Sequence, residues 1–485
     1  MGSHPLCCVL FHVNNDSRPG LSCRVLPHWA PVAYSLRMSR GITELVRQIY
    51  PDSRAQRCLD ELPRLLEQFR DRLRPPGDRG AANAAAELDQ ADSIIIACAD
   101  QFSGSDATPL AYLHRFLRED LDGYATGVHI LGFTPASSDD RLSVIDYRQV
   151  SAELGSWQDI AAIAAEFRLM VDLPQLNCEE PDLLIEMLAV VLLSAVHGAQ
   201  MIRFDSTAYC CKEPAVERPH QPHAPQIVAL VRAVTEEVAP WVVIVGESDE
   251  AHLVSNHTLA SLTLDACIRQ DSLQLQQWAG NLSPPADTRA FCNVLGTSDS
   301  DPSLPDDQRT RVFLVSHSIM LCMAGVPAIH ISSLIGTSNW SEDQQTSPSN
   351  RTIQHRALDY RQLVQELNDS HSLRNRVFDD CLQLLRVRAQ SAAFHPAARQ
   401  DILQTPQQVF AVLRTDQERQ ASVLCLHNLS HQAVDVGVER RYLRSTDERS
   451  FRDLISGDIF FPYWNAAGDA EITLDAYEAM WLRLL

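Results

Sequence analysis

The stretch MIRFD, Met201 to Asp205, decides the fold, because a short apolar run with the length of a buried strand ends there on a carboxylate. The segment VVIVGE, Val242 to Glu247, has the same form, and FCNVLGTSD, Phe291 to Asp299, carries an aspartate beyond its apolar run. Helical patterns separate these runs, so the chain alternates strand and helix. Such alternation is typical of a parallel sheet covered by helices.

Outward from these three segments, eight short apolar runs predict strands: Ser93 to Ala97, Val128 to Phe133, Leu169 to Leu173, Met201 to Asp205, Trp241 to Glu247, a weaker Ala251 to Ser255, Phe291 to Leu295 and Val326 to Ile331. Helical spacing predicts helices between them: Leu110 to Leu121, Trp157 to Phe167, Pro181 to Val196, Gln226 to Val238 and Arg309 to Met323. Eight strands, each followed by a helix, favour a closed parallel (β/α)8 barrel over an open doubly wound sheet.

The ends of the chain differ from this middle part. Residues 1–90 are expected to form an N-terminal helical extension, since apolar residues recur at helical spacing from Gly41 to Arg74. Whether this extension caps the bottom of the barrel or covers its rim stays open. The barrel is expected over residues 91–400, and short alternating runs predict a small antiparallel β domain over residues 401–485. The fold class is α/β.

Composition excludes several classes of function. Lysine and arginine number 41 against 62 aspartates and glutamates, so the formal charge of −21 argues against nucleic-acid binding. No stretch approaches the length of a membrane span, and the N-terminus predicts no secretory signal. The 13 cysteines are mostly scattered and form no CxxC pair, which fits a reducing compartment. We therefore expect a cytoplasmic protein with no membrane partner; its oligomeric state stays open.

The carboxylates at the strand ends are the candidate chemistry. Catalytic groups of such barrels lie at the carboxyl ends of strands, where Asp205, Glu247 and Asp299 fall. Arg203 precedes Asp205 by two residues, so both side chains point into the barrel mouth, where the cation keeps the carboxylate ionised. A single acid at a strand end is more often a helix cap. Three at one rim indicate glycoside chemistry.

These segments, in this order, resemble the α-amylase family of glycoside hydrolases, and within it the branch of sucrose phosphorylase and glucosylglycerate-type phosphorylases. The resemblance runs from about Ile94 to the C-terminus and is carried by GVHILGFTPASSDDRLSVIDYRQV (Gly127 to Val150), LGSWQDI (Leu154 to Ile160), MVDL (Met170 to Leu173), GAQMIRFDSTAYCCKE (Gly198 to Glu213), GVPAIHISSLIG (Gly325 to Gly336) and FHPAARQ (Phe394 to Gln400).

The resemblance implies a role for each matching residue. Asp205 resembles the nucleophile, Glu247 the acid/base and Asp299 the stabiliser of the transition state. Arg203 resembles the conserved partner of the nucleophile, and Asp139 an aspartate that binds the donor glucose.

Two further residues are carried over more loosely. Asn350 and Arg351 resemble an Asn-Arg stretch that would reach an acidic acceptor, with a structural salt bridge as an equal alternative.

The departures from the family concern the sugar site. The family follows its third strand with an aspartate and then Asn-His, whereas this chain reads VDLPQLN and has Asn177 near the histidine position. A second sugar-binding histidine is replaced by Ser298, and Arg141 replaces a glycine near the glucose site. The family's inserted domain is also missing, because only the 27 residues from Pro174 to Gln200 separate the third and fourth strands.

Two hypotheses follow. The first is an enzyme that acts on α-glucosides by a retaining double displacement, as a hydrolase, transferase or phosphorylase; retention of all three acids favours it. The second is a catalytically impaired relative that binds a sugar or a protein. The small-molecule partner is an α-glucoside or sugar in either case, and no cofactor is predicted. No metal site is predicted either, because His220 and His223 lie in a proline-rich stretch typical of a surface loop.

Overall fold

A parallel sheet forms the centre of the molecule. The computed structural model describes residues 39–75, 88–137, 144–173, 178, 180–204, 223–246, 272–273, 276, 290–293, 306–336, 357–416, 418, 421–443 and 450–484. The strands of the sheet are β1 (Ile94–Cys98), β3 (Gly127–Leu131), β4 (Arg168–Leu173), β5 (Ala199–Phe204), β6 (Val243–Gly246), β7 (Ala290–Asn293) and β8 (Val326–His330). Each coincides, within a few residues, with a run predicted from the sequence. The predicted run Ala251 to Ser255 lies outside the described residues.

The strand order is β6-β5-β4-β3-β1-β8-β7, and every neighbouring pair is parallel. The last strand, β8, therefore pairs with the first, β1, through Ile94↔Ala328 and the two pairs that follow. The other neighbours follow the order of the chain, which is the arrangement of strands around a barrel. The barrel predicted from the sequence is confirmed.

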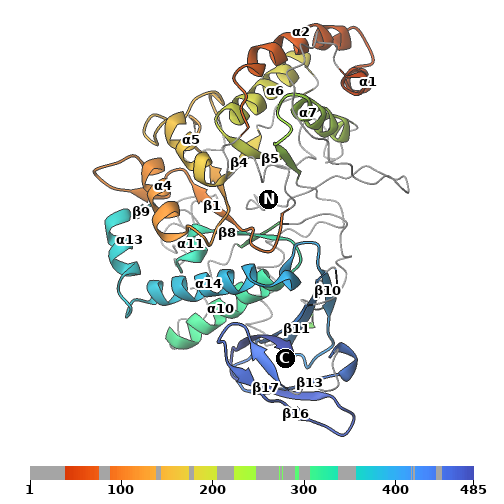
Figure 1. Ribbon diagram of the computed structural model, residues 1–485. Coiled ribbons are helices and arrows are strands. Elements are labelled where there is room, and N and C mark those ends of the chain that lie inside the picture. The colour runs from red at the N-terminus through yellow and green to blue at the C-terminus, as the bar shows by residue number, and fades with distance from the viewer. Residues whose placement is uncertain are drawn as a thin grey trace.

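Helices cover the outside of this sheet, as Figure 1 shows. The connecting helices are α4 (Pro109–Asp120), α5 (Trp157–Glu166), α6 (Pro181–Val196), α7 (Ala224–Val238) and α10 (Asp306–Cys322). Two helices that the sequence analysis did not predict, α13 (Tyr360–Leu367) and α14 (Leu373–Ala389), follow β8, and α14 packs against α10. None of the described helices is long and apolar enough to cross a membrane.

Residues 39–75, the described part of the N-terminal extension before residue 88, contain two helices rather than one continuous helical stretch. They are α1 (Arg40–Ile49) and α2 (Arg54–Arg70), and the break falls at Tyr50, which is extended because a residue before a proline disfavours the helical conformation. Helix α1 packs against α7 and α2 against α6, so the pair forms a second helical layer outside the barrel (Figure 1). Its buried residues, Val46 and Leu62 among them, belong to the same hydrophobic core as the barrel.

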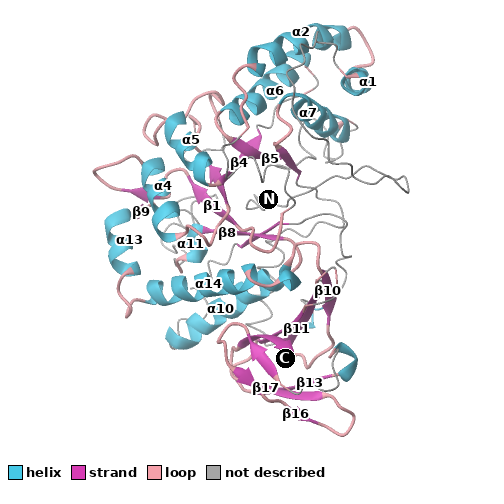
Figure 2. Ribbon diagram, viewed as in Figure 1, coloured by secondary structure: helices cyan, strands magenta, loops and turns pink. Residues whose placement is uncertain are grey.

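The C-terminal part is built of antiparallel strands, as predicted and as Figure 2 shows. A six-stranded sheet has the order β10-β11-β12-β18-β14-β15, and a three-stranded sheet has the order β13-β17-β16. The strands are β10 (Arg399–Ile402), β11 (Val409–Thr415), β12 (Ser422–Asn428), β13 (Val434–Val438), β14 (Phe451–Asp453), β15 (Ile459–Phe460), β16 (Tyr463–Trp464), β17 (Ala470–Leu474) and β18 (Ala479–Leu484). Apolar side chains of both sheets form a separate core, and α10 of the barrel contacts β12 and β18.

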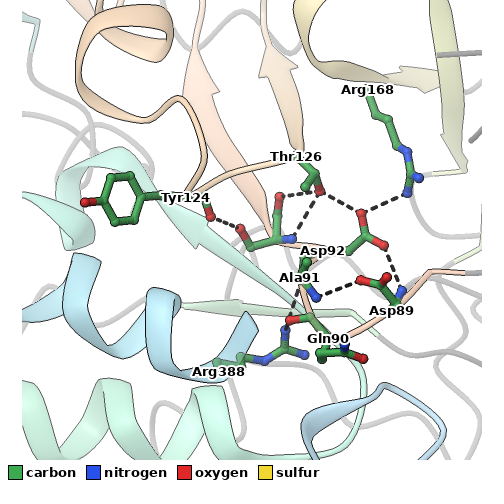
Figure 3. Close-up of polar contacts among 9 residues, drawn as sticks. Asp89, Gln90, Ala91, Asp92, Tyr124, Thr126, Arg168 and Arg388 are labelled. Atoms are coloured by element: carbon green, nitrogen blue, oxygen red, sulfur yellow. Dashed lines mark hydrogen bonds and ion pairs between the residues drawn. The ribbon is translucent and has the colours of Figure 1, made fainter. Parts of the chain in front are cut away.

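A polar network fastens the amino ends of the barrel strands (Figure 3). The Asp92 carboxylate, next to β1, lies 2.9 Å from Arg168 Nη1 at the start of β4. It also accepts a hydrogen bond of 2.8 Å from Thr126 Oγ1, just before β3. One carboxylate that is 5% exposed thus joins three strands at the end of the barrel that usually supplies stability.

Arg388 of α14 joins this network through the main-chain carbonyl of Asp92. Its side chain is 1% exposed, and it donates to five main-chain carbonyl oxygens, those of Gln90, Asp92, Leu321, Gly325 and Phe394. Gly325 directly precedes β8, and Asp92 lies two residues before β1. A single buried guanidinium therefore links the starts of β1 and β8 to helices α10 and α14.

We expect Arg388→Met to lower the free energy of unfolding by about 3 to 5 kcal/mol, because several buried carbonyl groups lose a donor. The matched control is Arg386→Met on the same helix, whose exposed side chain bonds the Tyr124 hydroxyl. That change should cost less than about 1 kcal/mol. Urea unfolding of the two variants measures the difference, and equal stability would contradict the role of Arg388.

Candidate functional site

Three polar side chains lie in the barrel interior near the carboxyl ends of adjacent strands: His129 on β3, Asp172 on β4 and Arg203 on β5. Strand alternation explains their direction. Their chain neighbours Ile130, Val171 and Ile202 belong to the core between sheet and helices, whereas Met170 and Met201, two residues from Asp172 and Arg203, belong to the cluster inside the barrel.

Asp172 connects the other two side chains. Arg203 Nε donates to Asp172 Oδ1 at 2.7 Å, and Arg203 Nη2 lies 3.5 Å from Oδ2. His129 Nε2 lies 2.8 Å from the same Oδ1 atom. Since an ionised carboxylate only accepts hydrogen bonds, His129 carries its proton on Nε2 in this contact. One carboxylate thus receives donors from both neighbouring strands.

The charges of this cluster are removed from water to different degrees. The side chains of His129 and Arg203 are fully buried, whereas Asp172 remains 30% exposed. Burial alone would raise the pKa of the Asp172 carboxyl, but the Arg203 guanidinium and the His129 ring hold that pKa well below its usual range. Asp172 is therefore a carboxylate at neutral pH and supplies the negative charge that buried Arg203 requires.

Of the candidates predicted from the sequence, Arg203 lies within the described residues, where its side chain is fully buried and bonded to Asp172. The others lie outside the described residues: Asp205, Glu247, Asp299, Asp139, Asn350 and Arg351. The positions where this chain departs from the family, Asn177, Ser298 and Arg141, lie outside them too. Their roles stay predictions.

Asp172 and His129 were not predicted as site residues, although the sequence carries a signal for both. Each is a polar residue at an inward position of a strand whose other residues are apolar. A polar residue at such a position needs a buried partner, so the two strands together indicated a polar contact.

The ends of strands β5 and β6 lie side by side, directly before two of the predicted acids. Phe204, the last residue of β5, is the register partner of Gly246, the last residue of β6. Asp205 and Glu247 follow these two residues directly in the sequence. The described strands therefore end side by side, immediately before the two carboxylates.

The connection after β4 is short. Strand β4 ends at Leu173 and helix α6 begins at Pro181, so only residues 174–180 join the carboxyl end of the strand to the helix. A segment of this length has no room for an inserted domain. The predicted loss of that domain is confirmed.

No three histidine, cysteine, aspartate or glutamate residues gather in a way that would hold a metal ion, as far as the described part of the chain extends.

The Asp172–Arg203 pair predicts a specific dependence of stability on pH. Because the folded-state pKa of Asp172 lies below its unfolded value of about 3.9, its stabilisation is present above that pH and is lost as the pH falls. Asp172→Asn should lower the free energy of unfolding by about 3 kcal/mol at pH 7, since Arg203 stays buried without this carboxylate.

Urea unfolding at pH 7 and at several values below 4 measures this effect, and the difference between Asp172→Asn and the unaltered protein should shrink below about pH 4. Asp182→Asn is the control, because Asp182 and its ion-pair partner Arg57 both have exposed side chains. A constant difference at all pH values would contradict the assignment of charge to Asp172.

Comparison with solved structures shows the fold alone. The chain is similar to the sucrose 6F-phosphate phosphorylase of Thermoanaerobacter thermosaccharolyticum, with a TM-score of 0.57 and 13% identity over 81% of this chain and 99% of that one. It is also similar to an α-amylase from H. orenii, with a TM-score of 0.60 and 14% identity over 81% and 99%. A family model described as "D-apionate lactonase, C-terminal immunoglobulin-like domain" matches residues 406–482.

The similar sequences are all named glucosylglycerate phosphorylase. The protein of Spirochaeta thermophila is 31% identical over 90% of this chain and 97% of its own length, and that of Escherichia coli is 24% identical over 92% and 100%. The first alignment spans 573 residues against 485 in this chain, so that relative carries segments that are missing here. These relatives are enzymes, and nothing in the comparisons favours the binding-scaffold alternative.

Identity and coverage of this extent, joined to the barrel and its C-terminal β domain, show that the chain belongs to the glucosylglycerate phosphorylase branch of the α-amylase family, whose members are enzymes that act on glucosides.

Proposed function

We propose that this chain transfers the glucosyl group of an α-glucoside by a retaining double displacement. The observation that carries the proposal is the position of Arg203: it is buried at the carboxyl end of β5, bonded to Asp172, two residues before Asp205. A fixed cation at this point favours the ionised form of a neighbouring carboxylate, which is the form that a nucleophile needs.

Each of the three acids has a defined part in the proposed reaction. Asp205 attacks the anomeric carbon while Glu247 protonates the departing oxygen, and a glucosyl-enzyme forms with inversion. Glu247 then takes the proton from the acceptor, which attacks the same carbon and restores the configuration. Asp299 stabilises the positive charge that develops on the sugar ring. The register of Phe204 with Gly246 supports the pairing of Asp205 with Glu247.

The donor is proposed from the relatives. Their name specifies glucosylglycerate, so an α-glucoside of glycerate is the first donor to examine. In this proposal Asp139 binds the donor glucose, and Asn350 and Arg351 contact the acidic acceptor side. A positively charged residue there suits a carboxylate such as that of glycerate.

The acceptor is proposed from the short β4–α6 connection. The domain that the family inserts at this position is missing, and with it any phosphate-binding arginine that relatives carry there. A site without that cover admits water more freely. We therefore propose that water or an organic acceptor, rather than phosphate, completes the reaction.

The division into an extension over residues 1–90, a barrel over residues 91–400 and a β domain over residues 401–485 remains part of this proposal, as does a cytoplasmic location. The location is supported by the cysteines: the six described ones, Cys58, Cys98, Cys178, Cys322, Cys381 and Cys425, form no disulfide.

Fluoride release from α-glucosyl fluoride tests the nucleophile. Fluoride is a good leaving group that needs little protonation, and it is too small to require contacts on the acceptor side of the site. Asp205→Asn should reduce release by about 10³-fold or more, since a neutral amide cannot form the glucosyl-enzyme. Asp60→Asn on the exposed side of α2 is the control and should match the unaltered protein. Undiminished release in Asp205→Asn would overturn the site.

Phosphate tests the acceptor in the same assay. We expect millimolar phosphate to raise the rate of fluoride release or glucosylglycerate cleavage less than about 2-fold, because the segment after β4 offers no inserted domain to bind it. Glucose should form in preference to glucose 1-phosphate, which product analysis measures. A strict requirement for phosphate would show that its site lies elsewhere in the chain.

A further inference from the structure

His129 stands apart from its surroundings inside the barrel. Its register partners on the two flanking strands are Ile96 and Met170, and both belong to the apolar cluster inside the barrel. The histidine itself is 0% exposed. An apolar residue would fill this position at less cost, because a buried imidazole must be hydrogen-bonded to be tolerated.

One contact of His129 connects it, through Asp172, to Arg203, which lies two residues before the proposed nucleophile Asp205. The Nε2 atom of His129 donates to Asp172 Oδ1 at 2.8 Å, and Arg203 Nε donates to the same oxygen at 2.7 Å. Asp172 keeps 30% exposure, so water competes for its oxygen atoms, and each buried donor restricts the rotation of the carboxylate. Arg203 on β5 is one buried donor, and His129 on β3, the other neighbour of β4, is a second.

We propose that His129 is a positioning residue of this active site: through Asp172 it holds the Arg203 guanidinium in the orientation that the nucleophile Asp205 requires. The inference rests on the proposed function. His129 touches no reacting atom in this scheme, and it acts through the carboxylate that it shares with Arg203. The chain uses three adjacent strands, β3, β4 and β5, to fix one cation beside one nucleophile.

The test replaces His129 with three residues that differ in whether their side chain can donate a hydrogen bond to Asp172. Gln places an amide nitrogen close to the position of Nε2, Asn places it about one carbon bond short, and Leu fills a similar volume with no donor. Met170→Leu, one strand away at the same level of the barrel, is the matched control for repacking. Each protein is assayed for fluoride release from α-glucosyl fluoride and for its melting temperature.

We expect His129→Leu and His129→Asn to lower kcat by about 10-fold to 100-fold with KM within about 3-fold, as loss of one hydrogen bond to a charged group would give. His129→Gln should recover most of the rate, and Met170→Leu should keep it. His129→Asn should also lower the melting temperature, because its buried amide loses its partner, so the near-constant KM and the double variant, rather than stability, separate positioning from a structural role. In an Asp172→Asn background, His129→Leu should cause no further loss, because both changes break the same connection.

Equal rates in the Gln and Asn variants would overturn the positioning role, whether or not the Leu variant folds. Additive losses in the double variant would overturn it as well. If the unaltered protein releases no fluoride, the proposed function itself fails, and the inference falls with it. That result is distinct from an active enzyme whose rate ignores His129, which overturns the positioning role alone.

Discussion

The pairing of β8 with β1 is the constraint on which the rest of the structure depends. It joins the last strand of the sheet to the first, although more than two hundred residues separate Ile94 from its partner Ala328. Because all the described pairs of this central sheet are parallel, the carboxyl ends of its strands lie at one rim, and the segments that follow them start from neighbouring points. The side chains that this rim collects determine what the barrel does.

The two ends of the barrel use buried charge in different ways. At the amino ends, Asp92 and Arg388 are bonded mostly to the main chain and to Thr126 and Arg168, so they fix strands and helices to one another. At the carboxyl ends, Asp172 receives donors from two side chains and remains partly open to water. The first arrangement stabilises the barrel. The second is suited to placing a cation for a reaction.

The short connection after β4 and the helices α1 and α2 lie at different places around the barrel. Residues 174–180 stand where the family inserts a domain, so the connection from β4 to α6 is short. The extension instead thickens the outside, where α1 and α2 pack on α7 and α6 and bury their apolar faces in the common core. The barrel therefore carries an added layer of helices on its outside and a short connection at the carboxyl end of β4.

Local pattern by itself determined much of this protein. Apolar runs such as MIRFD and VVIVGE identified strands, because a strand buried on both faces needs apolar residues throughout, and the helix Pro181–Val196 has the bounds that its pattern predicts. The order of strand and helix indicated the barrel, and the resemblance of several segments indicated the family. Pattern was less informative at Tyr50, where one proline divides the extension, and over α14, whose charged residues alternate with its apolar ones; the eight-residue helix α13 was not predicted either.

Only the tertiary structure decided which polar residues share a partner. His129 and Asp172 are 43 positions apart, and Asp172 and Arg203 are 31 apart, so no local period connects them. Their contact follows from the register of β3, β4 and β5, which depends on packing across the whole sheet. The same reason applies to Arg388, whose bonded carbonyl groups come from segments that meet only once the barrel has formed. A sequence specifies the side chains locally, whereas the distances between them depend on strand register and packing.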